Sequence, residues 1–392
     1  MVKNRIDRGP GTFLTGATGF LGGEVLARLL AAGDGPVYVL VRARTASEAD
    51  ARLKRTIVSL VGSDERWAGR ATAIPGDLTT PGLGLPQARR EWLAERTRRI
   101  IHCAASVSFT LGLDASRAIN VAGTSRLLDL AAMCNHRGGL ECFSHVSTAY
   151  VAGTHRGRFG ESDLDVGQDF RNGYERSKFE AEILVRRRSG SLPVQVLRPS
   201  IVVGDSRTGW TPAFNVIYWP LRAFARGSYQ AIPADPRAPV DVVPVDYVAD
   251  AVVALAGRAG TTYHLTAGDR ASSVGELIEL ACEQLDRPAP RVVSPRFYRR
   301  TIHPVLLRTG SEARRRALRR SEAYFPYFEI PTTYDDARTR EALGPRGLEA
   351  PPLRSYFPKL LDFAHAAKWG RHPVERRHAA RAVGVGRQPV AA

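Results

Sequence analysis

A glycine-spaced turn between an apolar run and an amphipathic helix constrains the fold of this chain more than any other feature. Residues 15–22 read TGATGFLG and put Gly16, Gly19 and Gly22 three residues apart. The apolar run Gly11–Leu14 before them predicts a strand, and the valine and leucines after them recur at helical spacing. We expect the glycines to supply positive φ angles and a close approach of the backbone. The turn therefore predicts a helix whose free N–H groups face a pyrophosphate, with an ordinary glycine-rich turn as the alternative.

The end of the second predicted strand indicates which dinucleotide binds. The strand Val37–Val41 is followed by Arg42, and no acidic residue stands at its tip. An acidic residue there would bind the ribose hydroxyls of NAD, whereas an arginine accommodates a 2′-phosphate. Arg44 and Arg52 are further candidates for this contact, although a solvated helix face explains them as well, Arg44 above all. The sequence therefore predicts NADPH.

Two later segments follow predicted strands and fit the same cofactor. Residues 76–78 (GDL) come after a third apolar run and are candidates for the adenine site. A fourth predicted strand, Arg99–Cys103, leads into Ala104, Ala105 and Ser106. Side chains this small let a cofactor lie against the backbone, so we expect them to contact it.

The segment 172–178 (NGYERSK) carries the candidate catalytic groups. Tyr174 and Lys178 are four residues apart and share one face of a predicted helix. A nearby ammonium favours the phenolate, which would make Tyr174 an acid or base near neutral pH. The preceding predicted strand ends in Ser147 and Thr148, and we expect Thr148 as the third catalytic group, with Ser147 as second choice. A chance surface pair is the alternative, because Tyr-x-x-x-Lys is common in helices.

These strings resemble those of the extended short-chain dehydrogenase/reductases, and within them the thioester reductase group with its male-sterility-type NAD-binding domain. That group contains fatty acyl-CoA reductases and the terminal reductase domains of carboxylic acid reductases and peptide synthetases. Further matching strings stand in family order at 40–43 (LVRA), 83–85 (LGL), 102–107 (HCAASV), 120–124 (NVAGT), 146–153 (VSTAYVAG), 198–205 (RPSIVVGD) and 243–250 (VPVDYVAD). The resemblance covers about residues 11–268. Sugar-nucleotide epimerases share much of this framework but favour NAD.

The resemblance implies a preference for thioesters and a set of cofactor contacts. It implies that Arg42 and Arg52 both contact the 2′-phosphate and that residues 199–202 line the nicotinamide. The cofactor residues expected from motifs and resemblance together are Gly16, Thr18, Gly19, Phe20, Leu21, Gly22, Arg42, Arg52, Asp77, Leu78, Ala104, Ala105, Ser106, Tyr174, Lys178, Pro199, Ser200, Ile201 and Val202.

The order of elements predicts an α/β fold. Strands and helices alternate to about residue 205, which favours a doubly wound parallel Rossmann sheet covered on both faces. We expect an NADP-binding Rossmann domain over 8–270, a smaller and mainly helical substrate lobe over 271–370, and disorder over 371–392. The segment 208–239 breaks the alternation and is rich in aromatic residues. We expect a substrate-side loop or lid there, with an aromatic packing patch as the alternative.

Composition narrows the cellular setting. The 392 residues are 44% hydrophobic, which suits a globular protein with a large core. Four cysteines without metal-ligand spacing predict free thiols in a reducing cytoplasm, and nine histidines form no ligand cluster, so we expect no metal. His102 and His145 lie on apolar strands and are expected in the core. No signal peptide is evident, and no apolar run is long enough to span a membrane.

The net charge of +17 can be explained by an anionic partner or by a solvated basic surface. Arg314, Arg315, Arg316, Arg319 and Arg320 crowd one predicted helix beside the aromatic run 324–328. Such a face could attract coenzyme A phosphates or an acidic carrier protein, could rest on an anionic membrane, or could simply be solvated. We expect no nucleic acid partner, because no nucleic-acid-binding motif is present. The sequence leaves the oligomeric state open.

The chemistry expected is NADPH-dependent reduction of an acyl thioester to an aldehyde and, with a second hydride, to an alcohol. Thr148 and Tyr174 would hydrogen-bond the oxyanion, Tyr174 would supply the proton, and Lys178 would hold the nicotinamide ribose and tune the phenol. The thioester, on coenzyme A or an acyl carrier protein, would be made elsewhere and arrive in trans. The alternatives are a dehydrogenase or epimerase of a sterol or sugar nucleotide and a cofactor-sensing protein without catalysis.

Overall fold

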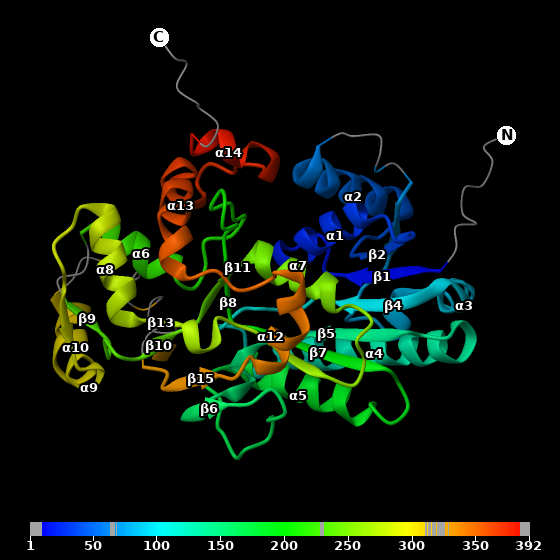
Figure 1. Cartoon of the computed structure of the whole chain (residues 1–392), viewed down its shortest axis with the longest axis horizontal. Helices are drawn as coiled ribbons and strands as arrows, with labels where there is room; N and C mark the ends of the chain where they lie inside the picture. The colour runs from blue at the N-terminus through cyan, green and yellow to red at the C-terminus, as the bar shows by residue number, and fades with distance from the viewer. Residues whose placement is uncertain are drawn as a thin grey trace, which may run out of the picture.

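The computed structural model describes residues 10–62, 67, 69–227, 231–309, 312, 315, 319, 326–327 and 329–384. Its centre is a seven-stranded parallel sheet in the order β3-β2-β1-β4-β5-β7-β12 (Figure 1). The strands are β1 Gly11–Thr15, β2 Val37–Val41, β3 Ala71–Pro75, β4 Thr97–His102, β5 Cys142–Val146, β7 Val194–Pro199 and β12 Thr262–Leu265. The strand order reverses between β1 and β4, and ligands of open α/β sheets bind at such a point.

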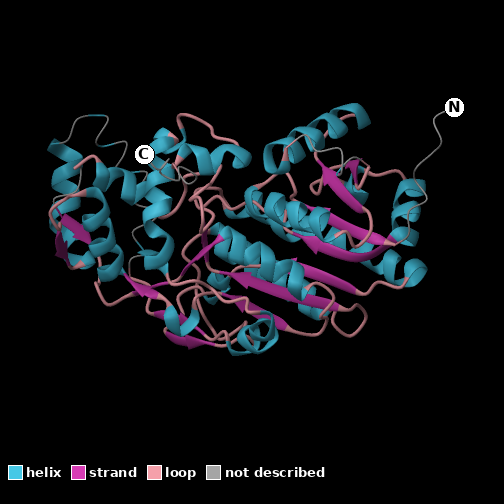
Figure 2. Cartoon of the chain, turned by 45° about the horizontal axis from the view of Figure 1, so that its top comes forward, coloured by secondary structure: helices cyan, strands magenta, loops and turns pink. Residues whose placement is uncertain are grey.

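Two helical layers cover this sheet, as Figure 2 shows. One layer holds α1 Phe20–Ala32, α2 Ala46–Val61 and α7 Val245–Leu255, and the other holds α3 Gln87–Arg96, α4 Leu113–Gly138 and α5 Gly173–Arg187. Each layer closes its own apolar core against the strands. In α1 the buried Val25, Leu26, Leu29 and Leu30 follow the helical spacing of the sequence. The predicted doubly wound Rossmann fold is thereby confirmed.

A smaller lobe stands beside the sheet on the left of Figure 1. Its helices are α6 Tyr218–Ala225, α8 Val274–Leu285, α9 Pro295–Phe297, α10 His303–Thr309 and α13 Leu353–Ala366, with a π-turn at Tyr298–Ile302. Short strand pairs accompany them: β8 Ile201–Val203 with β11 Val242–Pro244, β9 Ala231–Pro233 with β14 Arg291–Val293, and β10 Pro239–Val240 with β13 Ser272–Ser273.

The aromatic segment 208–239 contributes to this lobe as α6 and β9. Tyr218 and Phe224 are buried in the core of the lobe, and Trp210 is buried nearby in a second cluster, which is what the packing alternative expects. Residues 228–230 lie outside the described part of the chain. A lid over the substrate stays a hypothesis for this segment.

Part of the range expected for the lobe packs on the sheet domain. Strand β15 Thr332–Tyr334 pairs in parallel with β6 Gly157–Phe159, and α12 Ala337–Leu343 contacts α7 and β12. The buried Glu161 accepts hydrogen bonds from the Arg338 and Thr339 backbone N–H groups at the start of α12. A carboxylate at this end of a helix satisfies free N–H groups and complements the helix dipole.

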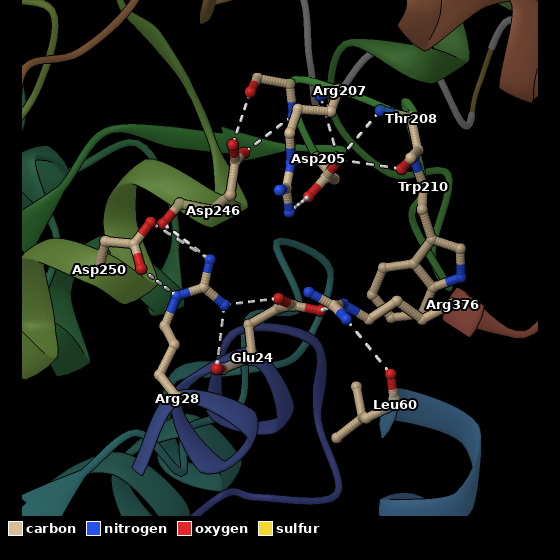
Figure 3. Close-up of polar contacts among 11 residues, drawn as sticks. Glu24, Arg28, Leu60, Asp205, Arg207, Thr208, Trp210, Asp246, Asp250 and Arg376 are labelled. Atoms are coloured by element: carbon tan, nitrogen blue, oxygen red, sulfur yellow. Dashed lines mark hydrogen bonds and ion pairs between the residues drawn. The ribbon is translucent and has the colours of Figure 1, made fainter. Parts of the chain in front are cut away.

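The structure differs from the expected disorder between residues 371 and 384. This C-terminal segment forms a short turn at Arg376–His378 and α14 Ala379–Ala382. Arg376 pairs with Glu24, a carboxylate of α1 with no exposed side-chain surface, and donates to the Leu60 carbonyl at the end of α2 (Figure 3). The Trp210 indole N–H donates to the Val374 carbonyl at 2.9 Å. These contacts with distant parts of the chain hold the segment, and residues 385–392 lie outside the described range.

Candidate active site

The glycine turn joins β1 to α1 and leaves the start of the helix open. Gly16 has a φ of 80°, and a Cβ there would lie 2.7 Å from the Ala104 nitrogen. Gly19 is the N-cap of α1, with a φ of −93° and no side-chain capping bond, so nearby N–H groups remain available for a phosphate. Gly22 lies within the helix, and its Cβ would be 2.2 Å from the Gly16 carbonyl oxygen. Positive φ was expected at three glycines but occurs only at Gly16. Gly19 is an N-cap with extended backbone, and Gly22 lies inside α1, where it is needed for space.

The neighbouring loop after β4 runs along this turn. The Ala104 N–H donates to Thr15 at 3.2 Å, and the Ser106 N–H donates to the Asn120 side chain at 2.8 Å. Asn120 also donates to Ser177 on α5, at 2.9 Å. It therefore ties the expected cofactor loop 104–106 to the helix of Tyr174. Our sequence reasoning missed Asn120 as a site residue, although it stands in the NVAGT string that carried part of the resemblance.

The remaining expected cofactor residues differ in exposure and in their contacts. Thr18 is exposed, Phe20 and Leu21 are half-buried, and the Trp210 ring meets Phe20 edge to face at 5.8 Å between centroids. Asp77 accepts from the Thr79 backbone and hydroxyl, both at 2.8 Å, and so caps its own turn. Leu78 and Ala105 are half-buried.

The tip of β2 brings two expected arginines together. Arg42 directly follows the strand and is exposed, and the Arg52 guanidinium donates to the Arg42 carbonyl. Arg44 is also exposed, and its backbone N–H donates to Glu48 on α2. Two guanidinium groups at this strand end fit a phosphate better than a diol.

The Tyr174 phenol sits at the start of α5, beside the end of β5. Asn172 caps this helix by accepting from the Glu175 N–H at 3.0 Å, which places Tyr174 in the first turn. The Thr148 side chain hydrogen-bonds Tyr174 and thereby lowers the pKa of the phenol, but burial has the larger effect and raises that pKa to about 12. Ser147, the second choice for the third group, donates to the buried Glu182 at 2.8 Å instead.

Lys178 lies one turn further along α5 and is buried. Its ammonium donates to the Val146 carbonyl at 2.8 Å and approaches the His145 Nε2 atom at 3.4 Å. Burial lowers the pKa of Lys178 to about 8, although the negative charge of Glu182 opposes this. The pKa of Tyr174 thus shifts in the direction opposite to the expected tuning, because burial of the phenol dominates and the ammonium is held at Val146.

A cluster of buried and half-buried apolar side chains adjoins the Tyr174 ring. Phe109 lies 5.6 Å from it between ring centroids and stacks on Tyr327 at 5.0 Å, while Tyr150 meets Tyr327 edge to face at 5.3 Å. Ile201 from β8 and the buried Ile330 complete this cluster. We call these five residues the aromatic wall.

The aromatic wall also contacts the α5 helix cap. The Tyr327 hydroxyl donates to Glu175 at 2.6 Å, and the Asn172 amide donates to that hydroxyl at 2.8 Å. Tyr327 was visible in the sequence only as part of an aromatic run, of which the described part is residues 326 and 327, and Phe109 was missed because no motif contains it.

Residues 199–202 pass beside Thr148, one of the candidate catalytic residues. The Pro199 carbonyl accepts from Thr148 at 3.4 Å; Ser200 is buried, and Ile201 and Val202 are half-buried. The strand end expected at the nicotinamide therefore lies against Thr148. The four cysteines are free thiols, and within the described ranges no group of histidine, cysteine and acidic residues could hold a metal. In that same part of the chain, no helix is long and apolar enough to cross a membrane.

Comparisons with known proteins agree with this arrangement. The family model described as "Male sterility protein", an NAD-binding family, matches residues 14–252. The fatty acyl-CoA reductase wat of Drosophila melanogaster is 29% identical over 283 residues, which are 63% of this chain and 54% of that protein. The isonitrile lipopeptide synthase of Streptomyces coeruleorubidus is 34% identical over 244 residues, which are 62% of this chain and 16% of that protein.

A solved structure extends the likeness to the lobe. The terminal R domain from the myxalamid PKS-NRPS biosynthetic pathway is similar with a TM-score of 0.79 and 28% identity, over 93% of this chain and 92% of that one. The chain spans about half the length of the fatty acyl-CoA reductases it matches. The resemblance stated from the motifs is confirmed, and the chain belongs to the male sterility family and carries an NAD(P)-dependent oxidoreductase domain of that family.

Proposed function

We propose that this protein uses NADPH to reduce an acyl thioester to an aldehyde. The observation that carries the proposal is the aromatic wall beside Tyr174 and Thr148. An acyl chain is stabilised by apolar and aromatic contacts, whereas a sugar needs several hydrogen-bonding partners around its hydroxyls. A sterol would also suit an apolar wall. The similarity to fatty acyl-CoA reductases and to a lipopeptide synthase supports a thioester substrate instead.

The residues around the glycine turn fit a dinucleotide. The open start of α1 and the space that Gly16 and Gly22 leave suit a pyrophosphate, and Arg42 with Arg52 would hold the 2′-phosphate. Asp77 and Leu78 would border the adenine, Ala104, Ala105 and Ser106 would face the cofactor, and Pro199, Ser200, Ile201 and Val202 would line the nicotinamide. When bound, the cofactor supplies the hydride for the substrate carbonyl.

The chain's own groups would then handle the oxygen and its proton. Thr148 and Tyr174 would orient the substrate carbonyl and hydrogen-bond the oxyanion as charge develops. With a pKa of about 12, Tyr174 keeps its proton at neutral pH and is therefore ready to act as the acid. Lys178 would bind the nicotinamide ribose. Collapse of the resulting hemithioacetal releases the thiol and the aldehyde, and a second reduction of a retained aldehyde would give the alcohol.

Substrate panels test this proposal. NADPH absorbance is followed with acyl-CoA, an acyl carrier thioester, an aldehyde, a sterol and a sugar nucleotide, using the wild type and the Tyr174→Phe variant. We expect NADPH consumption with a thioester in the wild type and almost none in the variant. Turnover confined to the sterol or the sugar nucleotide would assign the protein to an alternative function.

A basic surface on the lobe is the proposed attraction site for the substrate's carrier. Residues 291–309, from β14 to α10, contain five arginines and no acidic residue: Arg291, Arg296, Arg299, Arg300 and Arg308. All five are exposed, and Arg299 pairs with Glu329 at 3.1 Å. Of the expected cluster 314–320, Arg315 and Arg319 are described, and both are exposed. We propose that this surface attracts coenzyme A phosphates or an acidic carrier protein, or rests on an anionic membrane in a reducing cytoplasm.

A further inference from the structure

Two buried histidines lie side by side beneath Lys178. His102 of β4 and His145 of β5 pair directly in the sheet, with ring centroids 5.4 Å apart, and both are at most 1% exposed. Both nitrogens of His102 are engaged, with the hydroxyls of Thr15 at 2.8 Å and Thr124 at 3.1 Å. His145 differs, because its Nε2 faces the Lys178 ammonium and its Nδ1 has no partner among the described residues.

The protonation state of His145 follows from its surroundings. Burial lowers the pKa of His145 well below its ordinary value, and the positive charge of Lys178 acts in the same direction. A neutral imidazole has one donor and one acceptor nitrogen, and the nitrogen that faces an ammonium must be the acceptor. His145 therefore carries its proton on Nδ1 and accepts on Nε2. His102 cannot replace it, because both of its nitrogens are already bonded.

The Lys178 ammonium has three N–H groups, and the sheet engages two of them. One donates to the Val146 carbonyl and one to His145, both on the same stretch of β5. We propose that His145 is a positioning residue that holds Lys178 so that its third N–H faces the cofactor ribose, which rests on the role of Lys178 in the proposed function. The titratable groups that interact with this ammonium are Glu182 on α5, Cys103 after β4, His102 and His145, and Tyr174 lies one turn earlier on α5.

The proposal has a signature that a packing role lacks. An acceptor on Lys178 stabilises the charged ammonium, so its removal lowers the pKa of Lys178 below the present value of about 8. NADPH affinity should fall as pH rises through that pKa, because the neutral amine binds the ribose less well. In His145→Leu we expect the midpoint of this fall to move down by about 0.5 to 1 pH unit. In His145→Gln, whose amide oxygen can accept at a similar distance, the midpoint should stay near that of the wild type.

The experiment measures NADPH affinity by fluorescence between pH 6 and pH 9.5 without substrate. His102→Gln is the matched control, since it changes an equally buried histidine that has no bond to Lys178, and its midpoint should stay unchanged. If His145→Leu does not fold, His145→Asn replaces it, because its shorter amide keeps the polarity but does not reach the ammonium. The proposal would be overturned if the midpoint in His145→Leu equalled that of the wild type. It would also be overturned if His145→Gln or His102→Gln shifted the midpoint as much as His145→Leu does. The affinity titration contains no thioester, so its result does not depend on the substrate assay. A failed substrate assay would therefore reject the proposed function and leave the result for His145 standing.

Discussion

At the scale of single residues, the candidate site depends on a phenol that stays protonated and an ammonium that stays charged. Burial raises the pKa of Tyr174 away from neutrality and lowers the pKa of Lys178 towards it. The sequence could predict both residues and Thr148, since their motifs are local. The sequence could not predict the direction in which the pKa of Tyr174 shifts, because that direction depends on burial by Phe109 and other residues distant in sequence.

Replacing Tyr174 with phenylalanine removes the proton and keeps the ring. We expect thioester reduction to slow by about two to four orders of magnitude, since a positioned general acid contributes on that order. The dissociation constant of NADPH should change less than about threefold, because Lys178 is retained. Steady-state kinetics and fluorescence titration measure the two effects. Turnover near that of the wild type would mean that another group supplies the proton.

Replacing Arg42 with aspartate should change cofactor preference. A charge-assisted arginine–phosphate contact contributes about 1.5–3 kcal/mol, so the preference for NADPH over NADH should fall by roughly tenfold or more. The ratio of kcat/KM with NADPH to kcat/KM with NADH measures this preference. Arg44→Asp is the control, because the Arg44 backbone is held at Glu48 and the Arg42–Arg52 contact remains intact. The proposed 2′-phosphate site is wrong if wild type uses both cofactors equally well.

At the scale of elements, contacts between distant parts of the chain determine where α12 and the C-terminal segment lie, and the sequence could not predict these positions. The alternation of strands and helices along the chain followed from local periodicity and turn residues. The places of α12 and of the C-terminal segment depend on single pairs such as Glu161 with Thr339 and Glu24 with Arg376, which are 178 and 352 positions apart. No local pattern marks such partners, so an arginine-rich terminal stretch was mistaken for disorder over residues 371–384.

Replacing Arg376 with alanine tests the hold on this segment. Loss of one partner from a buried ion pair costs about 3–5 kcal/mol, but Glu24 keeps Arg28 at 2.6 Å. We therefore expect the free energy of unfolding to fall by about 1–3 kcal/mol in urea titrations. Arg377→Ala is the control: its partner Glu375 is half exposed, so the loss should stay below about 0.5 kcal/mol. Equal losses in the two variants would show that the Glu24 contact does not hold the segment.

At the scale of the whole molecule, we expect the Rossmann sheet domain to bind the cofactor and carry out the reaction, and the lobe to attract the substrate's carrier. The sheet domain carries the glycine turn and the helix of Tyr174 and Lys178. The lobe carries the basic surface of residues 291–309, and its helix α10 lies at the outer end of the lobe (Figure 1). The sequence already grouped this excess charge in the C-terminal part of the chain, and the structure places α9 and α10 at the outer end of the lobe (Figure 1). The aromatic wall, in contrast, combines residues 109, 150, 201, 327 and 330 from four regions of the chain.

Salt dependence tests the basic surface. Long-range attraction is screened over about 8 Å at physiological ionic strength, so the KM for an acyl-CoA or carrier thioester should rise with salt. The triple change Arg296→Ser, Arg300→Ser, Arg308→Ser should remove most of that rise and leave kcat with a small aldehyde unchanged. Changing the exposed Arg156, Arg187 and Arg258 to serine removes equal charge elsewhere and is the control. If both triple variants behave like the wild type with carriers, acyl-CoA and lipid vesicles, the arginines are only solvated.

The proposed reaction transfers hydride from the cofactor to a thioester carbonyl, with Tyr174 as the acid. The direct measurement uses NADPH carrying two deuterium atoms at nicotinamide C4, an acyl-CoA or acyl carrier thioester, and mass spectrometry of the product after trapping any aldehyde with hydroxylamine. We expect deuterium on the former carbonyl carbon, with one atom in an aldehyde and two in an alcohol. The rate of labelling should fall steeply in Tyr174→Phe. Product without deuterium at that carbon, or labelling at an equal rate in both proteins, would contradict it.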